Sequence, residues 1–452
     1  MPDQLSLRFP DDFQFGVATA AYQIEGSVLA DGRGASIWDT FSHTPGRVLN
    51  GDTGDVACDH YNRWAKDLDL IQELGISAYR FSIAWPRLFS EGRGQLNTRG
   101  LSFYDRLIDG CLERGIRVFP TLYHWDLPQT LADQGGWMNR GTAEAFAEYA
   151  AIVMDHLGDR VDAITTFNEP WCSAILGHLI GIHAPGERNL DHALAVVHGQ
   201  HHAHGLAVQA MRASRDSVQL GIVLNAQSIH PGSDSDADQE AALRHEAFHN
   251  GLFFDPLFKG SYPPLVCEAL GDRLPEHWQD DMGTIQQPLD FWGLNYYTPT
   301  YVTDSVNSDD DFPTTMSAKR PSVPRTDIGW EIDPQSFKRL LLELYKQYDL
   351  PPCYITENGA AYNHDVREGV VDDQPRIDYL QGHLLALREA LTQGIDVKGY
   401  FAWSLMDNFE WAEGYDMRFG LVHVDYATQK RTPKSSARWY QALLEEQHSN
   451  LD

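Results

Sequence analysis

Short runs of apolar and β-branched residues recur along the chain, and between them lie stretches with apolar residues spaced three and four apart. The runs predict buried strands of a parallel sheet, and the spaced stretches predict amphipathic helices, such as Tyr61–Leu74 and Ser336–Tyr348. The predicted strands are Phe13–Thr19, Ala78–Trp85, Arg117–Tyr123, Ala163–Asn168, Val218–Asn225, Phe291–Tyr297, Cys353–Glu357 and Lys398–Ser404. Alternation of strands and helices on this scale indicates a closed parallel barrel surrounded by helices.

We therefore predict an α/β fold, a single (β/α)8 TIM barrel with long βα loops, that spans residues 1–452 as one catalytic domain. An open doubly wound sheet is the structural alternative. Such a sheet normally carries a Gly-rich phosphate turn after an early strand, and no G-x-G-x-x-G occurs there. We expect the polar segment Thr303–Asp327 to form a long, partly mobile βα loop rather than a domain linker.

The composition argues against several classes of partner. The 452 residues carry a formal net charge of −29, whereas nucleic acids and anionic membranes require clustered Lys and Arg. No apolar run approaches the ~18 residues of a transmembrane helix, and no signal-peptide pattern is visible, so we expect a cytoplasmic protein. The five scattered cysteines favour free thiols in a reducing compartment over disulfides or a zinc site.

Two glutamates at predicted strand ends suggest the chemistry. Glu169 lies in Thr-Phe-Asn-Glu-Pro after the fourth strand, and Glu357 lies in Ile-Thr-Glu-Asn-Gly at the end of the seventh. Active sites of βα barrels form where strands end and loops begin, so both carboxyl groups are expected at the same edge. Hydrolysis of a sugar acetal needs such a pair: one group protonates the leaving oxygen, and the other attacks or activates water.

Other predicted strand ends carry amides, carboxylates and indoles, which match the hydroxyl edge and the C–H faces of a sugar ring. These residues are Gln23, His124, Trp125, Asn168, Asn295, Tyr297, Trp403, Glu410 and Trp411. A single Trp at a strand end is more often part of the core. Several Trp residues beside several polar strand ends favour a sugar site.

Taken in order, these segments resemble glycoside hydrolase family 1, the β-glucosidase family. The similar segments are Phe13–Gly26, Arg80–Arg87, Thr166–Pro170, Gly293–Tyr297, Ile355–Gly359 and Trp403–Trp411, and the resemblance runs from about Phe9 to Tyr440. It implies a (β/α)8 barrel that retains the anomeric configuration of its substrate and needs no cofactor.

The resemblance also implies residue roles. Glu169 is the expected acid/base and Glu357 the expected nucleophile, with their carboxyl groups about 5–5.5 Å apart. Arg80 and Tyr297 are expected to hold Glu357 as a carboxylate, whose charge should raise the pKa of Glu169. The expected substrate-binding residues are Gln23, His124, Trp125, Asn168, Asn295, Trp403, Glu410, Trp411 and Phe419. The expected aglycone side comprises Trp330, Cys172, His183, Asn225, Leu176 and Trp171. From their position just after Glu169, we expect Trp171 and Leu176 to form a narrow apolar neck that limits rebinding of glucose.

We therefore predict a retaining exo-β-glucosidase that removes terminal β-D-glucosyl residues from cellobiose or aryl β-glucosides, with a role in cellulose degradation. β-Galactosides and β-fucosides are expected as further substrates. The acidic segment around Glu410 should repel a sugar 6-phosphate, and a glutamate rather than a glutamine at Glu169 favours O-glycosides. Mainly galactosidase, fucosidase or transglycosylating activity is the alternative. A non-catalytic sugar-binding protein would be expected to lack one of the two glutamates.

One motif points elsewhere. His245-Glu246-Ala247-Phe248-His249 spells the H-E-x-x-H of zinc peptidases, which makes such a peptidase a remote alternative. It falls in a predicted peripheral helix after the fifth strand, and no third ligand follows at the usual spacing. We expect no metal and no cofactor. The expected partner is a small-molecule glucoside or oligosaccharide. The sequence leaves open whether the chain forms a homo-oligomer.

Overall fold

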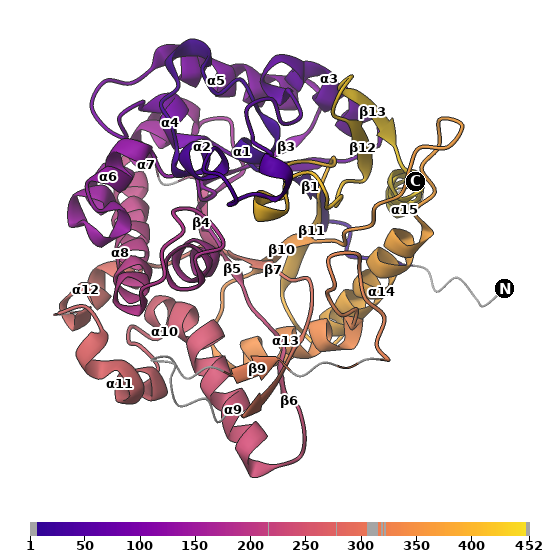
Figure 1. Cartoon of the computed structure of the whole chain (residues 1–452). Helices are drawn as coiled ribbons and strands as arrows, with labels where there is room; N and C mark the ends of the chain where they lie inside the picture. Colours follow the sequence, from indigo (N-terminus) through magenta and orange to yellow (C-terminus); the bar gives the residue numbers. More distant parts are fainter. Residues whose placement is uncertain are drawn as a thin grey trace.

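The computed structural model describes residues 7–215, 217–276, 278–304, 315–317, 320 and 322–448. In this part of the chain, parallel strands close into a barrel in the order β1-β11-β10-β7-β5-β4-β3-β2, and helices surround it (Figure 1). The barrel strands are β1 (Gln14–Ala18), β2 (Ala78–Ser82), β3 (Arg117–Tyr123), β4 (Ala163–Asn168), β5 (Gln219–Asn225), β7 (Trp292–Asn295), β10 (Cys353–Asn358) and β11 (Val397–Trp403). The predicted (β/α)8 fold class is confirmed.

Each predicted strand overlaps one barrel strand, and the ends differ by no more than two residues in all cases but one. The exception is Ala78–Trp85, because β2 ends at Ser82 and Trp85 begins the short helix α4 (Trp85–Leu88). Pro86 lies in the first turn of that helix, where the N–H that proline lacks would have no intrahelical partner. An apolar run at a barrel strand can therefore continue into the following helix.

The helices of the outer layer pack against the strands through one apolar face. The predicted helices Tyr61–Leu74 and Ser336–Tyr348 correspond to α3 and α13 within two residues. The longer helices are α3 (His60–Glu73), α5 (Thr98–Glu113), α7 (Arg140–Leu157), α8 (Leu190–Ser214), α9 (Asp236–Glu246), α13 (Pro334–Gln347), α14 (Gln374–Leu391) and α15 (Ser435–His448). The shorter ones are α1 (Ala21–Ile24), α2 (Ile37–Ser42), α6 (Gln129–Asp133), α10 (Leu252–Phe258), α11 (Pro264–Leu270) and α12 (Trp278–Ile285).

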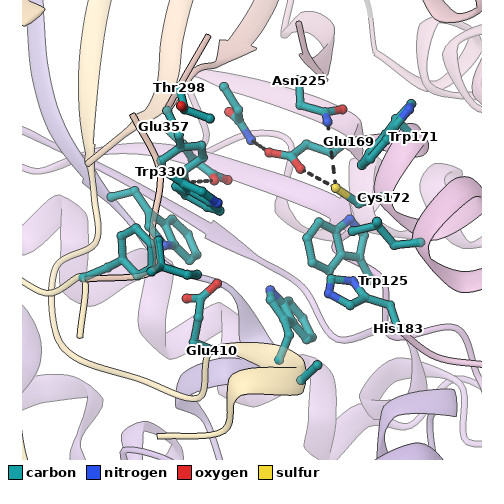
Figure 2. A pocket seen from close by; sticks show the side chains of 18 of the residues that line it. Trp125, Glu169, Trp171, Cys172, His183, Asn225, Thr298, Trp330, Glu357 and Glu410 are labelled. Carbon is teal, nitrogen blue, oxygen red and sulfur yellow. Dashed lines mark hydrogen bonds between the residues drawn. The ribbon is translucent and has the colours of Figure 1, made fainter. Parts of the chain in front are cut away.

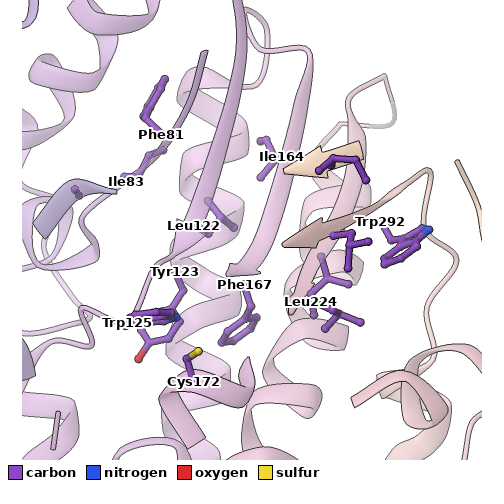
Figure 3. Close-up of a cluster of buried hydrophobic side chains, with 14 of the residues drawn as sticks. Phe81, Ile83, Leu122, Tyr123, Trp125, Ile164, Phe167, Cys172, Leu224 and Trp292 are labelled. Atoms are coloured by element: carbon purple, nitrogen blue, oxygen red, sulfur yellow. The ribbon is translucent and has the colours of Figure 1, made fainter. Parts of the chain in front are cut away.

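Residues of the barrel strands alternate between two apolar layers. In β2, Tyr79 and Phe81 belong to the large cluster between strands and helices, which Figure 3 shows at Phe81 and Ile164. Ala78 belongs to the smaller cluster inside the barrel. The same period of two turns the Arg80 side chain into the barrel, where it is 2% exposed.

Additional small sheets flank the barrel. β12 (Val422–Asp425) and β13 (Lys430–Pro433) form an antiparallel hairpin, and β6 (Ile229–Pro231) pairs with β8 (Thr300–Asp304), which pairs with β9 (Thr315–Ser317). Most of the predicted mobile loop 303–327 lies outside the described residues. Among the described helices, none is both long and apolar enough to cross a membrane. All five cysteines are free thiols.

Candidate active site

A cavity of about 470 Å³ opens at the carboxyl ends of the barrel strands, where most of its lining residues lie. Most of the residues that we predicted for the site line it: Glu169, Glu357, Tyr297, His124, Trp125, Asn295, Trp403, Glu410, Trp411, Phe419, Trp330, Cys172, His183, Asn225, Leu176 and Trp171. Arg80, Gln23 and Asn168 are not part of the lining. The side chains of Arg80 and Asn168 contact lining residues. Nε2 of Gln23 donates to Oδ1 of Asn408 and to the carbonyl oxygen of Phe409, directly before Glu410. The barrel thus gathers side chains from segments between His124 and Phe419 into one cavity.

Glu357 is held by donors on both carboxylate oxygens. Nη1 of Arg80 donates to Oε1 at 2.6 Å, and the hydroxyl of Tyr297 donates to Oε2 at 2.6 Å. The motif glycine Gly359 serves the neighbouring strand, because a Cβ at this position would lie 1.8 Å from the carbonyl oxygen of Trp403. Glycine therefore lets the ends of β10 and β11 approach closely enough to share the site.

Glu169 follows β4 with φ 46, in the left-handed region that non-glycine residues rarely adopt. Its backbone N–H donates to the carbonyl of Val223 on β5 at 2.9 Å, which anchors this conformation. Its Oε1 accepts from Nδ2 of Asn295 at 2.6 Å, and its Oε2 accepts from the thiol of Cys172 at 2.8 Å (Figure 2). No cation contacts this carboxyl among the described residues, in contrast to Glu357.

The two carboxyl groups have different electrostatic surroundings. Burial, and secondarily the charge of Glu357, raise the pKa of Glu169 to about 7. Burial also raises the pKa of Glu357, but Arg80 and the hydroxyl of Tyr297 oppose this effect by favouring the ionised form. Because the guanidinium of Arg80 contacts Glu357 and no cation contacts Glu169 among the described residues, the pair loses its first proton at Glu357, and Glu169 keeps its own near neutral pH.

Several polar side chains around the cavity hydrogen-bond within the protein and still have one atom without a partner. Within the described residues, Oε1 of Gln23, Nδ1 of His124 and Oε2 of Glu410 are buried and have no partner. Burial and the nearby Arg80 keep the pKa of His124 well below its usual range, so the imidazole is neutral. Burial, then the charges of Glu357 and Glu169, raise the pKa of Glu410 to about 8. These atoms can exchange hydrogen bonds with sugar hydroxyls.

Two asparagines connect the glutamates to the surrounding strands. Oδ1 of Asn168 accepts from Nη2 of Arg80 at 2.6 Å, and its Nδ2 lies 3.0 Å from Nε2 of His124. Nδ2 of Asn295 donates to both Asn168 and Glu169, at 3.0 and 2.6 Å. Both amide hydrogens of Asn295 are therefore used inside the protein, which makes it a support for the acid carboxyl.

Indole rings form much of the cavity wall. Trp125 and Trp411 pack with their ring centroids 4.5 Å apart, and both have positive φ values, 77 and 50. Trp330 lies 5.1 Å from Tyr297 and 5.7 Å from Phe419, measured between ring centroids. Trp125, Trp411 and Glu169 all have positive φ values and all line this cavity. Such strained backbone conformations are common at functional sites.

Sequence reasoning missed several lining residues, namely Ile182, Ala226, Gln227, Thr298, Ile328, Ala412 and Glu413. All seven are next to, or within two positions of, a residue that we predicted, so their position in the chain was a usable signal. Ile328 lies two residues before Trp330 in a segment without a clear pattern.

The H-E-x-x-H motif takes part in packing. His245 and Glu246 end α9, and His249 lies in the π-helical segment η5 (Ala247–Gly251). The His249 ring packs on Trp171 with centroids 4.5 Å apart, and Nε2 of His245 lies 3.3 Å from Oε1 of Gln227. The described residues contain no group of three side chains that could hold a metal.

In a TIM barrel, two carboxyl groups with unlike surroundings at the strand ends are typical of enzymes that hydrolyse sugar acetals. The family model for glycosyl hydrolase family 1 matches residues 5–449. The chain belongs to glycosyl hydrolase family 1, and it is a glycoside hydrolase of the β-glucosidase type.

Named relatives agree with this assignment. A β-glucosidase of Agrobacterium sp. is 58% identical over 98% of this chain and 96% of its own length. β-Glucosidase A of Thermotoga maritima is 51% identical over 97% of this chain and 98% of its own length. The structure of the virulence factor SghA, solved in complex with its substrate analog salicin, matches with TM-score 0.96 and 57% identity, covering 99% of both chains.

Proposed function

We propose that the chain is a retaining exo-β-glucosidase that works by double displacement, with Glu357 as nucleophile and Glu169 as acid/base. The observation that carries this proposal is the unequal environment of the pair. Arg80 and Tyr297 donate to Glu357, whereas the pKa of Glu169 is raised to about 7.

In the first step, the Glu357 carboxylate attacks the anomeric carbon while the proton of Glu169 moves to the leaving glycosidic oxygen. The bond between the anomeric carbon and that oxygen breaks, and a glucosyl ester of Glu357 forms. In the second step, Glu169 removes a proton from water, the water oxygen attacks the anomeric carbon, and the ester bond breaks. Each step inverts the anomeric carbon, so the released glucose is β.

The substrate proposal rests on buried polar groups in and beside the cavity. Gln23, His124 and Glu410 offer buried unpartnered atoms for the hydroxyls of a terminal sugar, with Glu410 assigned to the 4- and 6-hydroxyls. Trp403 is assigned to the ring face. The matching SghA complex holds salicin, an aryl β-glucoside, which supports aryl β-glucosides as substrates beside cellobiose.

β-Galactosides and β-fucosides are proposed as additional substrates, since they differ from glucosides only at the 4- and 6-positions. We also propose that the chain acts as one domain, because the family match covers residues 5–449. Cytoplasmic location, a role in cellulose degradation and the oligomeric state stay predictions.

The test is the anomer that is released first from an aryl β-glucoside, followed by proton NMR before mutarotation. β-Glucose as the first product is expected. α-Glucose as the first product would overturn both residue roles, since it would mean a single inverting displacement. Absence of hydrolysis with aryl β-glucosides, β-galactosides and β-fucosides would overturn the substrate assignment.

A further inference from the structure

The side chain of Cys172 contacts the proposed acid/base. Cys172 begins the π-helical segment η4 (Cys172–Ile180), lines the cavity and is 6% exposed. Its thiol donates to Oε2 of Glu169 at 2.8 Å, and its backbone N–H donates to the carbonyl oxygen of Glu169 at 3.0 Å. On the other side, Nδ2 of Asn225 lies 3.9 Å from the sulfur (Figure 2). The thiol is therefore held in place against one carboxyl oxygen.

The two oxygens of Glu169 have partners of different kinds. Oε1 accepts from an N–H of Asn295 at 2.6 Å, and since a carbonyl oxygen accepts better than a hydroxyl oxygen, this contact favours the proton on the other oxygen. The amide of Asn295 cannot be reversed without loss, because its Nδ2 also donates to Oδ1 of Asn168 at 3.0 Å, an oxygen that Arg80 fixes as an acceptor. The proton of the neutral acid therefore lies on Oε2, the oxygen beside the thiol. A thiol can both donate and accept, weakly in each case.

We infer that Cys172 is a positioning residue for Glu169, which keeps Oε2 in place as the oxygen that gives and takes the catalytic proton. The thiol donates to Oε2 when Glu169 is ionised and accepts from it when Glu169 is protonated. Because sulfur is a weak acceptor, the contact orients the proton without retaining it when the glycosidic oxygen approaches. The inference rests on the proposed function, in which Glu169 is the acid/base.

Other groups also act on Glu169 and must stay constant in any test. The titratable or charged ones come from separate elements: Glu357 on β10, Arg80 on β2, Tyr297 after β7 and Glu410 after β11. Burial and Glu357 raise the pKa of Glu169, while the thiol and Arg80 lower it. Removing only the thiol should therefore raise that pKa.

The test compares Cys172→Ala and Cys172→Ser, with Cys111→Ala as a matched control. Cys111 is a buried thiol in helix α5 and does not line the cavity. The measurements are kcat/KM against pH for phenyl β-glucoside, whose leaving group needs protonation, and for 2,4-dinitrophenyl β-glucoside, whose leaving group does not. Thermal unfolding of each variant reports whether the fold is retained.

For Cys172→Ala we expect the basic limb of the pH profile to move up by about half a pH unit. We expect kcat/KM at the optimum to fall about tenfold for phenyl β-glucoside and less than about twofold for the dinitrophenyl substrate. Cys172→Ser, which keeps a group that donates and accepts, should stay close to the wild type in both properties. Cys111→Ala should match the wild type.

An unmoved basic limb, or equal losses on both substrates, would overturn the inference, because a purely structural role has these effects. If Cys172→Ala does not fold, the Cys172→Ser variant decides. A basic limb that moves to higher pH in Cys172→Ser would overturn the inference, and a basic limb at the wild-type position would support it. Glu169→Gln separates this outcome from failure of the proposed function. If Glu169→Gln hydrolyses phenyl β-glucoside at the wild-type rate, the acid/base assignment itself is wrong.

Discussion

The hydroxyl of Tyr297 donates to Oε2 of Glu357 at 2.6 Å, while Arg80 occupies the other oxygen of the same carboxylate. Tyr297, which follows β7, and Arg80, inside β2, thus stabilise the negative charge of Glu357 at the end of β10. This charge in turn raises the pKa of Glu169, so the same contacts that prepare the proposed nucleophile also keep the proposed acid protonated.

The first prediction concerns this hydrogen bond. Tyr297→Phe removes a donor that lowers the pKa of Glu357, so the acid limb of the kcat/KM profile should move to higher pH, by about one unit. The rate at the optimum should fall about tenfold or more. Tyr345→Phe is the control, because its hydroxyl bonds backbone carbonyls away from the cavity. An acid limb that stays in place would contradict the proposed support of Glu357.

The second prediction concerns the coupling between the carboxyl groups. Glu357→Gln removes a negative charge that raises the pKa of Glu169, so this pKa should fall from about 7. It should stay above the ordinary value for glutamate, since burial is the larger cause. Carbon-13 NMR titration of labelled glutamate, with Glu169→Gln used to assign the resonance, measures it. A pKa that is unchanged in Glu357→Gln would show that burial acts alone.

The third prediction separates the roles by chemical rescue. Glu169→Ala should lose about 10³-fold in turnover of an aryl glucoside, and azide should restore it as β-glucosyl azide. Glu357→Ala with azide should instead give α-glucosyl azide, because azide replaces the nucleophile on the opposite face. The product anomer is read by NMR. Interchanged products would reverse the two assignments.

The fourth prediction concerns Glu410. Its Oε2 is buried without a partner among the described residues, and we assign it to the 4- and 6-hydroxyls. Glu410→Gln should therefore lower kcat/KM more for β-glucosides than for β-fucosides, which lack the 6-hydroxyl, by about tenfold in the ratio. Equal losses for both sugars would place Glu410 away from the 6-position.

The fifth prediction concerns product inhibition. Trp171 and Leu176 both line the cavity beside Glu169, and we predicted that they restrict rebinding of glucose. Leu176→Ala should widen this neck and lower the inhibition constant for glucose several-fold. Ile180→Ala is the control, because Ile180 lies in the same π-helical segment with its side chain exposed. Strong inhibition of the wild type at low millimolar glucose would contradict the prediction that Trp171 and Leu176 restrict rebinding of glucose.

The barrel strands were readable from the sequence because each is buried on both faces, so each appears as an apolar run that ends in polar residues. The boundary after Ser82 was less predictable, since the run continues through Trp85 into helix α4. The end of a strand depends on where its neighbours stop pairing, and the pattern of one segment does not contain that information.

The sequence by itself determined the alternation of strands and helices, the strand ends that carry Glu169 and Glu357, and the aromatic residues that surround them. These features are local, because they follow from residue type and spacing. Only the tertiary structure decided that Asn295 faces one oxygen of Glu169 and Cys172 the other, and which oxygen of Glu357 accepts from Arg80. Such contacts join residues up to 277 positions apart, and their distances arise only when the barrel closes.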